Sequence, residues 1–319
     1  MKKAVITGGN GFIGKILTDK LIEKGYTVKI FSRNKPHAFA DNPAVETVRV
    51  DYNSVESLKS ELLDAEVVFH LAAAIFAFNK EEFWQANVTV TENLTEAVKQ
   101  AGCIKSFVYL SSQAAAGPSA YKNNPKTEAD APNPVSDYGI TKLKAEDAVM
   151  ALPQEVHKVI LRAPVVYGKN DSGVSKIAGW VKKGFMVNTS SGDMFFNFVY
   201  VEDLVKALYT AAVTPQAGGQ VFFVGEAQSY SWQHFINSMA DAMGSPRPIM
   251  FTLPYFFLEI AAFVYESIAK VFGIAPALNY DKIKEASITG HWVCNTNKWM
   301  ALTGQSFTPL EQGLRESFK

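Results

Sequence analysis

The sequence predicts an α/β protein with a doubly wound parallel sheet and a smaller, mostly C-terminal region. Short β-rich runs alternate with helical patterns along the first half of the chain, and a glycine-rich turn follows the first run. Strands that alternate with helices of this length form a parallel sheet covered on both faces. A chain of 319 residues, 48% of them hydrophobic, is long enough to bury such a core.

Each element of the expected sheet is marked by its own residues. The first strand runs into the glycine turn, after which apolar residues at helical spacing predict a helix that ends at Gly25. Longer helical patterns cover residues 83–101, ending at Gly102, and residues 138–150, and a shorter pattern covers residues 58–63. The expected strands are residues 3–6, 28–31, 47–50, 67–71, 107–110 and 159–161.

Composition and targeting signals exclude several classes of protein. Lys plus Arg and Asp plus Glu each number 31, so no net field attracts nucleic acid or an anionic membrane. Two cysteines, Cys103 and Cys294, and five scattered histidines predict neither a disulfide framework nor a metal site. The N-terminal apolar run ends at Thr7, and the apolar stretch 254–273 carries three charges. We therefore expect a cytoplasmic protein without nucleic-acid partners or stable membrane insertion.

The glycine turn after the first strand has the spacing of a dinucleotide-binding loop. Gly8 permits a tight turn, Gly11 lets the backbone approach a pyrophosphate, and Gly14 allows the helix to pack closely on the strand. The N–H groups at the start of the helix would bind the anion. The residues expected to hold the cofactor here are Thr7, Gly8, Asn10, Gly11, Phe12, Ile13 and Gly14.

The end of the second strand indicates which dinucleotide is bound. A site for NAD usually places a carboxylate there, against the ribose 2′-hydroxyl. This chain instead has Ser32, Arg33 and Lys35, which offer donors and positive charge to a 2′-phosphate. NADP is therefore the expected cofactor, with NAD as the alternative if these side chains are only solvated loop residues.

Tyr138 and Lys142 form a candidate acid–base pair. They are four residues apart and so lie on one helix face. A nearby ammonium favours the phenolate and brings the pKa of a tyrosine toward the working pH. Ser111 and Ser112 directly follow the fifth strand, at the sheet edge where open α/β folds bind ligands. Alone, each pair is also compatible with an ordinary helix surface or turn.

Together these motifs resemble the extended short-chain dehydrogenase/reductase superfamily, in its NAD(P)-dependent epimerase/dehydratase and 3β-hydroxysteroid-dehydrogenase-like group. The resemblance covers nearly the whole chain. Besides the glycine turn and YGITK at 138–142, it rests on HLAA at 70–73, YLSS at 109–112, RAP at 162–164, FVYVED at 198–203 and PLEQGL at 309–314.

The resemblance implies a Rossmann fold and a role for each matching residue. Ser112, Tyr138 and Lys142 would be the catalytic trio, with Ser112 favoured over Ser111 by counting back from Gly117. Asp51 and Tyr52 would border the adenine, and Asn87 would brace the active site. The other residues assigned to the cofactor are Leu71, Ala72, Ala73 and Pro164.

Residues 1–165 are expected to form the dinucleotide-binding Rossmann domain, to which residues 198–225 return. Residues 166–197 and 226–319 are expected to form the substrate-binding region. Phe196 lies where sugar-nucleotide members of the superfamily usually carry an arginine that clamps a diphosphate. Its presence predicts an apolar small-molecule substrate, and the phrase SSQAAAGPSAYK is similar to dihydroflavonol-4-reductase and 3β-hydroxysteroid dehydrogenase relatives.

The leading hypothesis is an NADP-dependent oxidoreductase that transfers hydride to or from a hydrophobic alcohol/ketone pair, acting as a monomer or homodimer. A nucleotide-sugar epimerase or dehydratase is the enzymatic alternative, and a non-catalytic dinucleotide-sensing protein is another. Residues 255–272 carry an apolar stripe at helical spacing and are predicted to cap the substrate pocket. Packing against the sheet domain or lying on a membrane surface would explain the same stripe.

Overall fold

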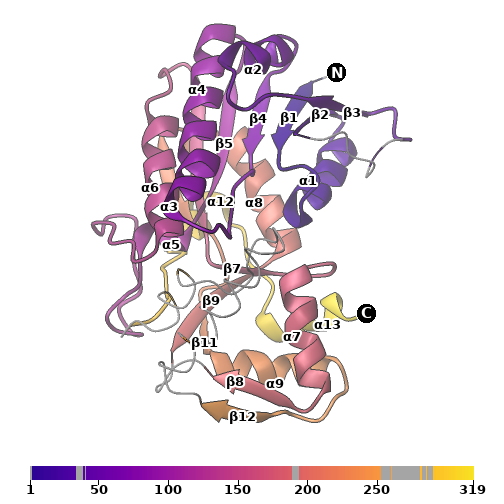
Figure 1. Cartoon of the computed structure of the whole chain (residues 1–319), viewed down its shortest axis with the longest axis vertical. Helices are drawn as coiled ribbons and strands as arrows, with labels where there is room; N and C mark the ends of the chain where they lie inside the picture. The colour runs from indigo at the N-terminus through magenta and orange to yellow at the C-terminus, as the bar shows by residue number, and fades with distance from the viewer. Residues whose placement is uncertain are drawn as a thin grey trace.

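A seven-stranded sheet occupies the larger part of the computed structural model, in the order β10-β6-β5-β4-β1-β2-β3 (Figure 1). Every neighbouring pair is parallel, which confirms the predicted doubly wound fold. The strands are β1 (Lys3–Thr7), β2 (Thr27–Ser32), β3 (Val45–Arg49), β4 (Val67–His70), β5 (Ser106–Ser112), β6 (His157–Ala163) and β10 (Gln220–Phe223). The structure describes residues 2–33, 39, 41–188, 194–252, 260, 281, 285 and 290–319.

Helices cover both faces of this sheet because its strands are apolar on both sides. Ala4 and Ile6 of β1 belong to the core shared with α1 (Phe12–Glu23) and α8 (Val201–Val213). Val5 points the other way, into the core under α2 (Val55–Leu62), α4 (Val90–Ala101) and α6 (Asp137–Met150). Figure 1 shows these two helical layers on opposite sides of the strands. Alternate residues of one strand thus anchor different layers.

The long helix expected over residues 83–101 is divided into segments. It begins as α3 (Lys80–Phe83), passes through a π-helical turn (Trp84–Thr89) and continues as α4. Gly102 ends it with a φ of 67°, as the sequence predicts. The remaining short helices are α5 (Gln113–Ala116), a 3₁₀ turn (Pro215–Ala217) and α12 (Asn297–Thr303).

A smaller region lies beyond the carboxyl edge of the large sheet. Its three-stranded sheet has β9 (Phe195–Tyr200) between β7 (Val165–Tyr167) and β11 (Ser229–Ser231). A second sheet pairs β8 (Phe185–Asn188) with β12 (Ile249–Thr252), and the helices are α7 (Ser172–Lys182), α9 (Trp232–Ala242) and α13 (Leu310–Ser317). Stacked rings of Phe198 and Phe235, 4.6 Å apart, lie in its own core.

The segment 198–225 connects the two parts of the structure. Its helix, α8, packs on the large sheet, and β10 joins β6 at the edge of that sheet, whereas β9 pairs with β7 and β11. The helix expected at 255–272 lies outside the described residues, apart from Ile260. No helix in the described part of the chain has the length and apolar character needed to cross a membrane.

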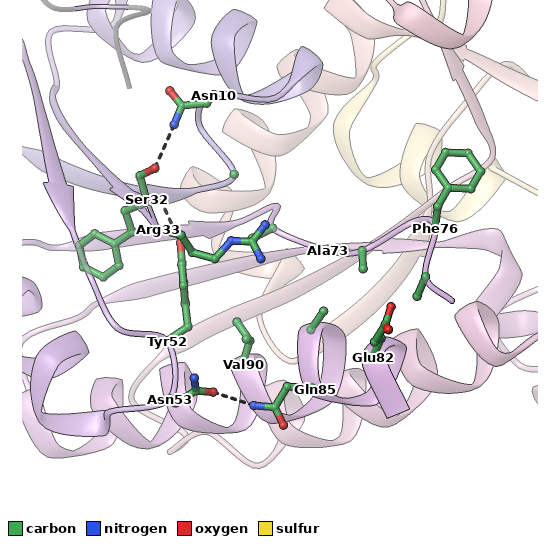
Figure 2. Close-up of a pocket in the computed structure, with 16 residues that line it drawn as sticks. Asn10, Ser32, Arg33, Tyr52, Asn53, Ala73, Phe76, Glu82, Gln85 and Val90 are labelled. Atoms are coloured by element: carbon green, nitrogen blue, oxygen red, sulfur yellow. Dashed lines mark hydrogen bonds between the residues drawn. The ribbon is translucent and has the colours of Figure 1, made fainter. Parts of the chain in front are cut away.

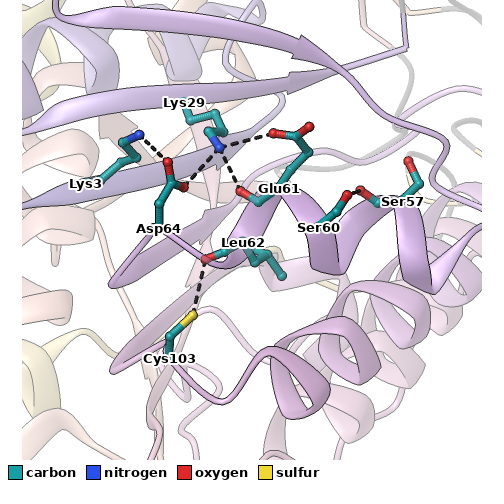
Figure 3. Close-up of polar contacts among 8 residues, drawn as sticks. All are labelled: Lys3, Lys29, Ser57, Ser60, Glu61, Leu62, Asp64 and Cys103. Carbon is teal, nitrogen blue, oxygen red and sulfur yellow. Dashed lines mark hydrogen bonds and ion pairs between the residues drawn. The ribbon is translucent and has the colours of Figure 1, made fainter.

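A buried lysine holds α2 against the large sheet (Figure 3). Lys29 of β2 is 5% exposed, and its ammonium donates to Glu61 O at 3.0 Å, Glu61 Oε2 at 3.1 Å and Asp64 Oδ1 at 3.0 Å. Lys3 also donates to Asp64. Each hydrogen of the Lys29 ammonium therefore has an acceptor, which is the condition for burying such a charge.

Replacing Lys29 by methionine removes these bonds and leaves two carboxylates facing each other. We expect Lys29→Met to lower the free energy of unfolding by about 1–3 kcal/mol. Lys59→Met is the matched control, because Lys59 forms only a solvent-exposed pair with Glu56 on α2 and its loss should cost about 0.5 kcal/mol or less. Urea titration measures both, and equal effects would contradict the role of Lys29.

Candidate active site

The glycine turn lies where the strand order reverses, since β1 is flanked by β2 on one side and β4 on the other. Open α/β sheets bind ligands at this point, beyond the carboxyl ends of the strands. Gly8 has a φ of +75° and accepts a hydrogen bond from Gly11 N at 3.0 Å. A Cβ at Gly14 would lie 2.2 Å from Gly8 O, so only glycine lets α1 begin this close to β1.

Two connected cavities form one cleft along this edge. Their volumes are about 830 and 730 Å³, and both are lined by Gly8, Ala73 and Phe76. The first extends toward the end of β2, and the second extends toward β5 and α6. Cavities of this size are typical of small-molecule and cofactor sites.

The first cavity has the features of a site for the adenosine half of a dinucleotide. Ser32 Oγ accepts from Asn10 Nδ2 at 3.4 Å, and Figure 2 shows the Arg33 guanidinium extending over the cavity. Tyr52 lines the wall and donates to Phe31 O at 3.0 Å. Asn10 Oδ1 is buried without a hydrogen-bond partner among the described residues, which leaves an acceptor for a ligand.

The start of α1 suits the phosphates. Gly11 is the N-cap residue in an extended conformation, and no side chain caps this helix. Its first N–H groups are therefore available to an anion. Together with the glycine packing and the unpaired Asn10 oxygen, this fits a dinucleotide.

The second cavity brings Ser112, Tyr138 and Lys142 together. Ser112 Oγ accepts from Ala114 N at 3.1 Å at the start of α5, an arrangement that leaves its hydroxyl hydrogen for a ligand. Ser111 also borders the cavity, but its hydroxyl donates to Glu146 Oε1 at 2.5 Å. That carboxylate is held by Arg162 in two further bonds, at 2.9 and 2.6 Å. Of the two serines, Ser111 thus has its hydroxyl hydrogen already bound by Glu146, whereas Ser112 does not.

Lys142 is almost fully buried one helical turn from Tyr138. Its Nζ donates to Leu110 O at 2.8 Å and lies 4.1 Å from the centre of the Tyr109 ring. Burial lowers the pKa of Lys142 to about 7, although the Glu146 carboxylate acts to raise it. The ammonium is therefore easily deprotonated when no ligand shares its charge.

A chain of hydrogen bonds begins behind the glycine turn. Thr7 Oγ1 accepts from Ala72 N at 3.1 Å and lies 2.6 Å from His70 Nδ1. His70 Nε2 lies 2.9 Å from Thr91 Oγ1, which itself donates to Asn87 O at 2.6 Å. Thr91 must then accept from His70 Nε2–H, so Nδ1 accepts from Thr7. Burial, aided by the charge of Lys142, lowers the pKa of His70 to about 3 and keeps the ring neutral.

The same chain of hydrogen bonds continues to α6. Asn87 Oδ1 accepts from Ala74 N at 2.7 Å, and Asn87 Nδ2 donates to Ala74 O and to Thr141 Oγ1, each at 3.1 Å. Thr141 donates to Tyr138 O at 3.0 Å. Thr7 and Asn87 therefore support the cleft from behind its lining.

The far wall of the second cavity is apolar and poor in positive charge. Phe196, the residue that the sequence analysis assigned to the substrate, lines this wall together with Trp292. Among the described lining residues, Lys142 is the only cation, while Asp171 and Glu285 are acidic.

Two carboxylates that the sequence did not single out hold the start of α6. Asp281 Oδ1 accepts from Asp137 N at 2.6 Å, and Asp281 Oδ2 accepts from Tyr138 N at 3.1 Å. Ser136 Oγ donates to Glu285 Oε1 at 2.6 Å. They come from a stretch without a recognisable motif, so only the tertiary structure reveals them.

Most of the residues assigned from the sequence line the cleft. Asp51 is exposed and accepts from Asn53 N, and Lys35 lies outside the described residues. Asn53 and Gln85, which the sequence analysis missed, line the first cavity and are bonded to each other at 2.6 Å (Figure 2). The assigned residues on the lining are Gly8, Asn10, Gly11, Phe12, Ile13, Gly14, Ser32, Arg33, Tyr52, Leu71, Ala72, Ala73, Ser112, Tyr138, Lys142, Pro164 and Phe196.

A parallel sheet, a glycine turn at its switch point and a tyrosine–lysine pair on the adjoining helix define the extended short-chain dehydrogenase/reductase class. Residues 4–225 match the model of the family described as "NAD dependent epimerase/dehydratase family". This match spans well over half of the chain, and the chain belongs to that family. NAD(P) is the dinucleotide typical of the family.

Relatives with named activities include dehydrogenases, reductases and epimerases. The sterol-4-alpha-carboxylate 3-dehydrogenase, decarboxylating, of Mus musculus is 26% identical over 85% of this chain and 76% of its own length. The ceramide reductase of Caulobacter vibrioides is 28% identical over 78% of this chain and 73% of its own length. An uncharacterized protein of Sinorhizobium fredii is 32% identical over 66% of this chain, which spans only 54% of that relative.

A solved structure is similar along the entire chain. MoeE5 in complex with UDP-glucose and NAD superposes with a TM-score of 0.76 at 25% identity, covering 99% of this chain and 97% of MoeE5. The chain therefore shares its fold with a protein whose structure was solved with NAD bound.

The pKa of Lys142 predicts a pH dependence of stability. The unfolded chain retains this proton up to about pH 10.5, whereas the folded chain releases it above about pH 7. Since the unfolded state binds more protons within this window, the contribution of Lys142 to stability rises with pH. We expect the melting temperature of the cofactor-free protein to rise relative to that of Lys142→Met across this window. Lys144→Met, on the exposed side of α6, should follow the wild type, and parallel profiles for all three would refute the shift.

Proposed function

We propose that this protein is an NADP-dependent oxidoreductase that transfers hydride between the nicotinamide and a hydrophobic alcohol or ketone. The observation that carries the proposal is the wall facing the Ser112–Tyr138–Lys142 trio, where Phe196 and Trp292 replace a cationic clamp. A nucleotide diphosphate needs compensating positive charge, and a lining with two carboxylates and one deeply placed lysine supplies little. A neutral, apolar substrate fits this surface better.

The names of two relatives support an apolar substrate. One is called a sterol carboxylate dehydrogenase and another a ceramide reductase, and both names refer to hydrophobic molecules that carry hydroxyl or carbonyl groups. We also propose a division of the chain into two binding regions. Residues 1–165, with 198–225, would bind the dinucleotide, and residues 166–197 and 226–319 would bind the substrate.

Each member of the trio has a distinct part in the proposed mechanism. When bound, NADPH would supply the hydride for reduction and NADP⁺ would accept it in oxidation. Tyr138 gives a proton to the carbonyl oxygen during reduction, or takes it from the hydroxyl during oxidation. Lys142 stabilises the Tyr138 phenolate, and the Ser112 hydroxyl donates to the reacting oxygen. The bonds that Asp281 accepts and the bond that Thr141 donates hold the first turn of α6, which carries Tyr138 on the cavity that Ser112 also lines.

Removing the phenolic hydroxyl tests this mechanism. We expect Tyr138→Phe to keep the fold and NADP binding but to lower kcat by roughly 10²-fold or more, the usual contribution of a positioned acid–base group. Tyr121→Phe is the control, because Tyr121 is exposed and outside the cleft lining. Steady-state kinetics with any substrate found is the measurement. Turnover by Tyr138→Phe near that of the wild type would exclude Tyr138 from the mechanism.

The preference for NADP is proposed to come from Ser32, Arg33 and Lys35. We expect Arg33→Ala to weaken NADPH binding by about 1–3 kcal/mol and to leave NADH binding almost unchanged, because only NADPH carries the 2′-phosphate. Arg315→Ala, on α13, should change neither affinity. Calorimetric titration measures the affinity for both cofactors. Equal affinity of the wild type for NADH and NADPH would contradict the proposed preference for NADP.

A nucleotide-sugar epimerase or dehydratase is the second candidate, favoured by the similarity to MoeE5 with UDP-glucose and NAD. Binding measured with NADP⁺ present separates the two. We expect flavonoid, steroid or aromatic ketones to bind and UDP- and dTDP-sugars not to bind. Micromolar affinity for the sugar nucleotides, with none for the ketones, would replace the proposed function by the epimerase.

A further inference from the structure

The small sheet of β8 and β12 is apolar on both of its faces. Its inner face packs Met186 and Met250 against the core of the smaller region. On its outer face, Phe185 pairs with Ile249, and Phe251 lies further along β12. These outward side chains are 38%, 66% and 52% exposed, respectively. A sheet at the end of a molecule normally turns a polar face to water. An exposed apolar face of this kind is typical of an interaction site.

A tryptophan from α7 extends the same surface. The Trp180 ring meets the edge of Phe185 at a centroid distance of 5.2 Å and is 47% exposed. Figure 1 shows α7, β8 and β12 at the end of the molecule farthest from β1, β2 and β3. We call this surface, formed by Trp180, Phe185, Ile249 and Phe251, the terminal apolar face. Its residues are gathered together, and exposed apolar residues scattered singly would need no such explanation.

The terminal apolar face is bordered by positive charge. Lys176, Lys182 and Lys183 are exposed on α7 and directly after it, and Lys183 Nζ lies 4.5 Å above the Trp180 ring. Residues 172–188 and 243–252 contain no Asp or Glu. The whole chain has no net charge, so this concentration of lysine is a local departure from the composition. The sequence alone does not show that these lysines border an apolar surface, because two residues of that surface, Ile249 and Phe251, come from β12.

We propose that the terminal apolar face docks on the surface of an anionic phospholipid bilayer. Tryptophan and other apolar side chains enter the interfacial layer, while lysines at the border contact the phosphate groups. This mode of binding needs no membrane-spanning helix.

The proposal extends the proposed function, because a bilayer is where a hydrophobic alcohol or ketone collects. Docking by this face would place the substrate-binding region beside its substrate. The enzyme would then take up substrate from the membrane surface instead of from water. Binding to lipid is nevertheless measured without substrate or turnover, so the two proposals fail independently.

Co-sedimentation with lipid vesicles tests the docking. We expect the full chain to sediment with vesicles of phosphatidylcholine mixed with phosphatidylglycerol, and to bind pure phosphatidylcholine vesicles much less. Added salt should weaken the binding, because part of it is electrostatic. No sedimentation with either vesicle, or equal sedimentation with both, would overturn the proposal.

Matched variants locate the binding on the terminal apolar face. Ile249→Ser with Phe251→Ser, and separately Lys182→Gln with Lys183→Gln, should each lower the affinity for anionic vesicles by about tenfold or more. Leu63→Ser with Tyr121→Ser is the control, since both residues are exposed and apolar but lie elsewhere. The lysine variants alter only exposed side chains, so they decide the question if the serine variants do not fold. Unchanged binding by the lysine variants would overturn the proposal.

Light scattering separates the bilayer from a second copy of the chain. We expect the same mass for the wild type and the serine variants in solution. A dimer in the wild type that these substitutions dissociate would assign the face to a self-contact and overturn the proposal. If the protein binds anionic vesicles as expected but binds sugar nucleotides instead of ketones, the docking proposal is supported and the proposed substrate class is wrong.

Discussion

The neutral imidazole of His70 is the constraint on which the arrangement of the cleft depends. It lies at the carboxyl end of β4, without contact to water, between a threonine of β1 and a threonine of α4. Its two nitrogens have opposite roles, so the hydrogen bonds from Thr7 through His70 and Thr91 to Asn87 O all run in one direction. A protonated ring would offer two donors and break this order at Thr7. The low pKa of His70 therefore keeps this order of donors and acceptors behind the glycine turn.

Local sequence signals were sufficient for the large sheet. Each expected strand overlaps a strand of that sheet to within a residue or two at its ends, because a buried parallel strand is a short apolar run with a turn after it. The glycine turn and the Tyr138–Lys142 spacing are also local, and their residues line the cleft. The division of the helix at 80–101 was not foreseen, since a π turn leaves no distinct pattern in composition or periodicity.

The contacts that the sequence did not predict join distant segments. Asp281 and Glu285 lie well over a hundred residues from the α6 turn that they hold, and no spacing rule relates them. Trp292 reaches Phe196 of β9 through an isolated β-bridge. The terminal apolar face likewise arises only when α7 and β12 both pack against β8. Such features follow from packing, and a single sequence carries no periodic signal for them.

The π turn at Trp84–Thr89 has a consequence for how this chain tolerates change in length. The wider turn accommodates one extra residue, so Gln85 and Ala86 face the dinucleotide cavity while Asn87, the very next residue, is turned toward Ala74 and Thr141. Deleting one residue here would restore a regular helix and rotate everything before it by about 100°. Either Gln85 and Ala86 would then leave the cavity wall, or Asn87 would lose its hydrogen bonds to Ala74 and Thr141. In this short stretch, the number of residues therefore matters as much as their identity.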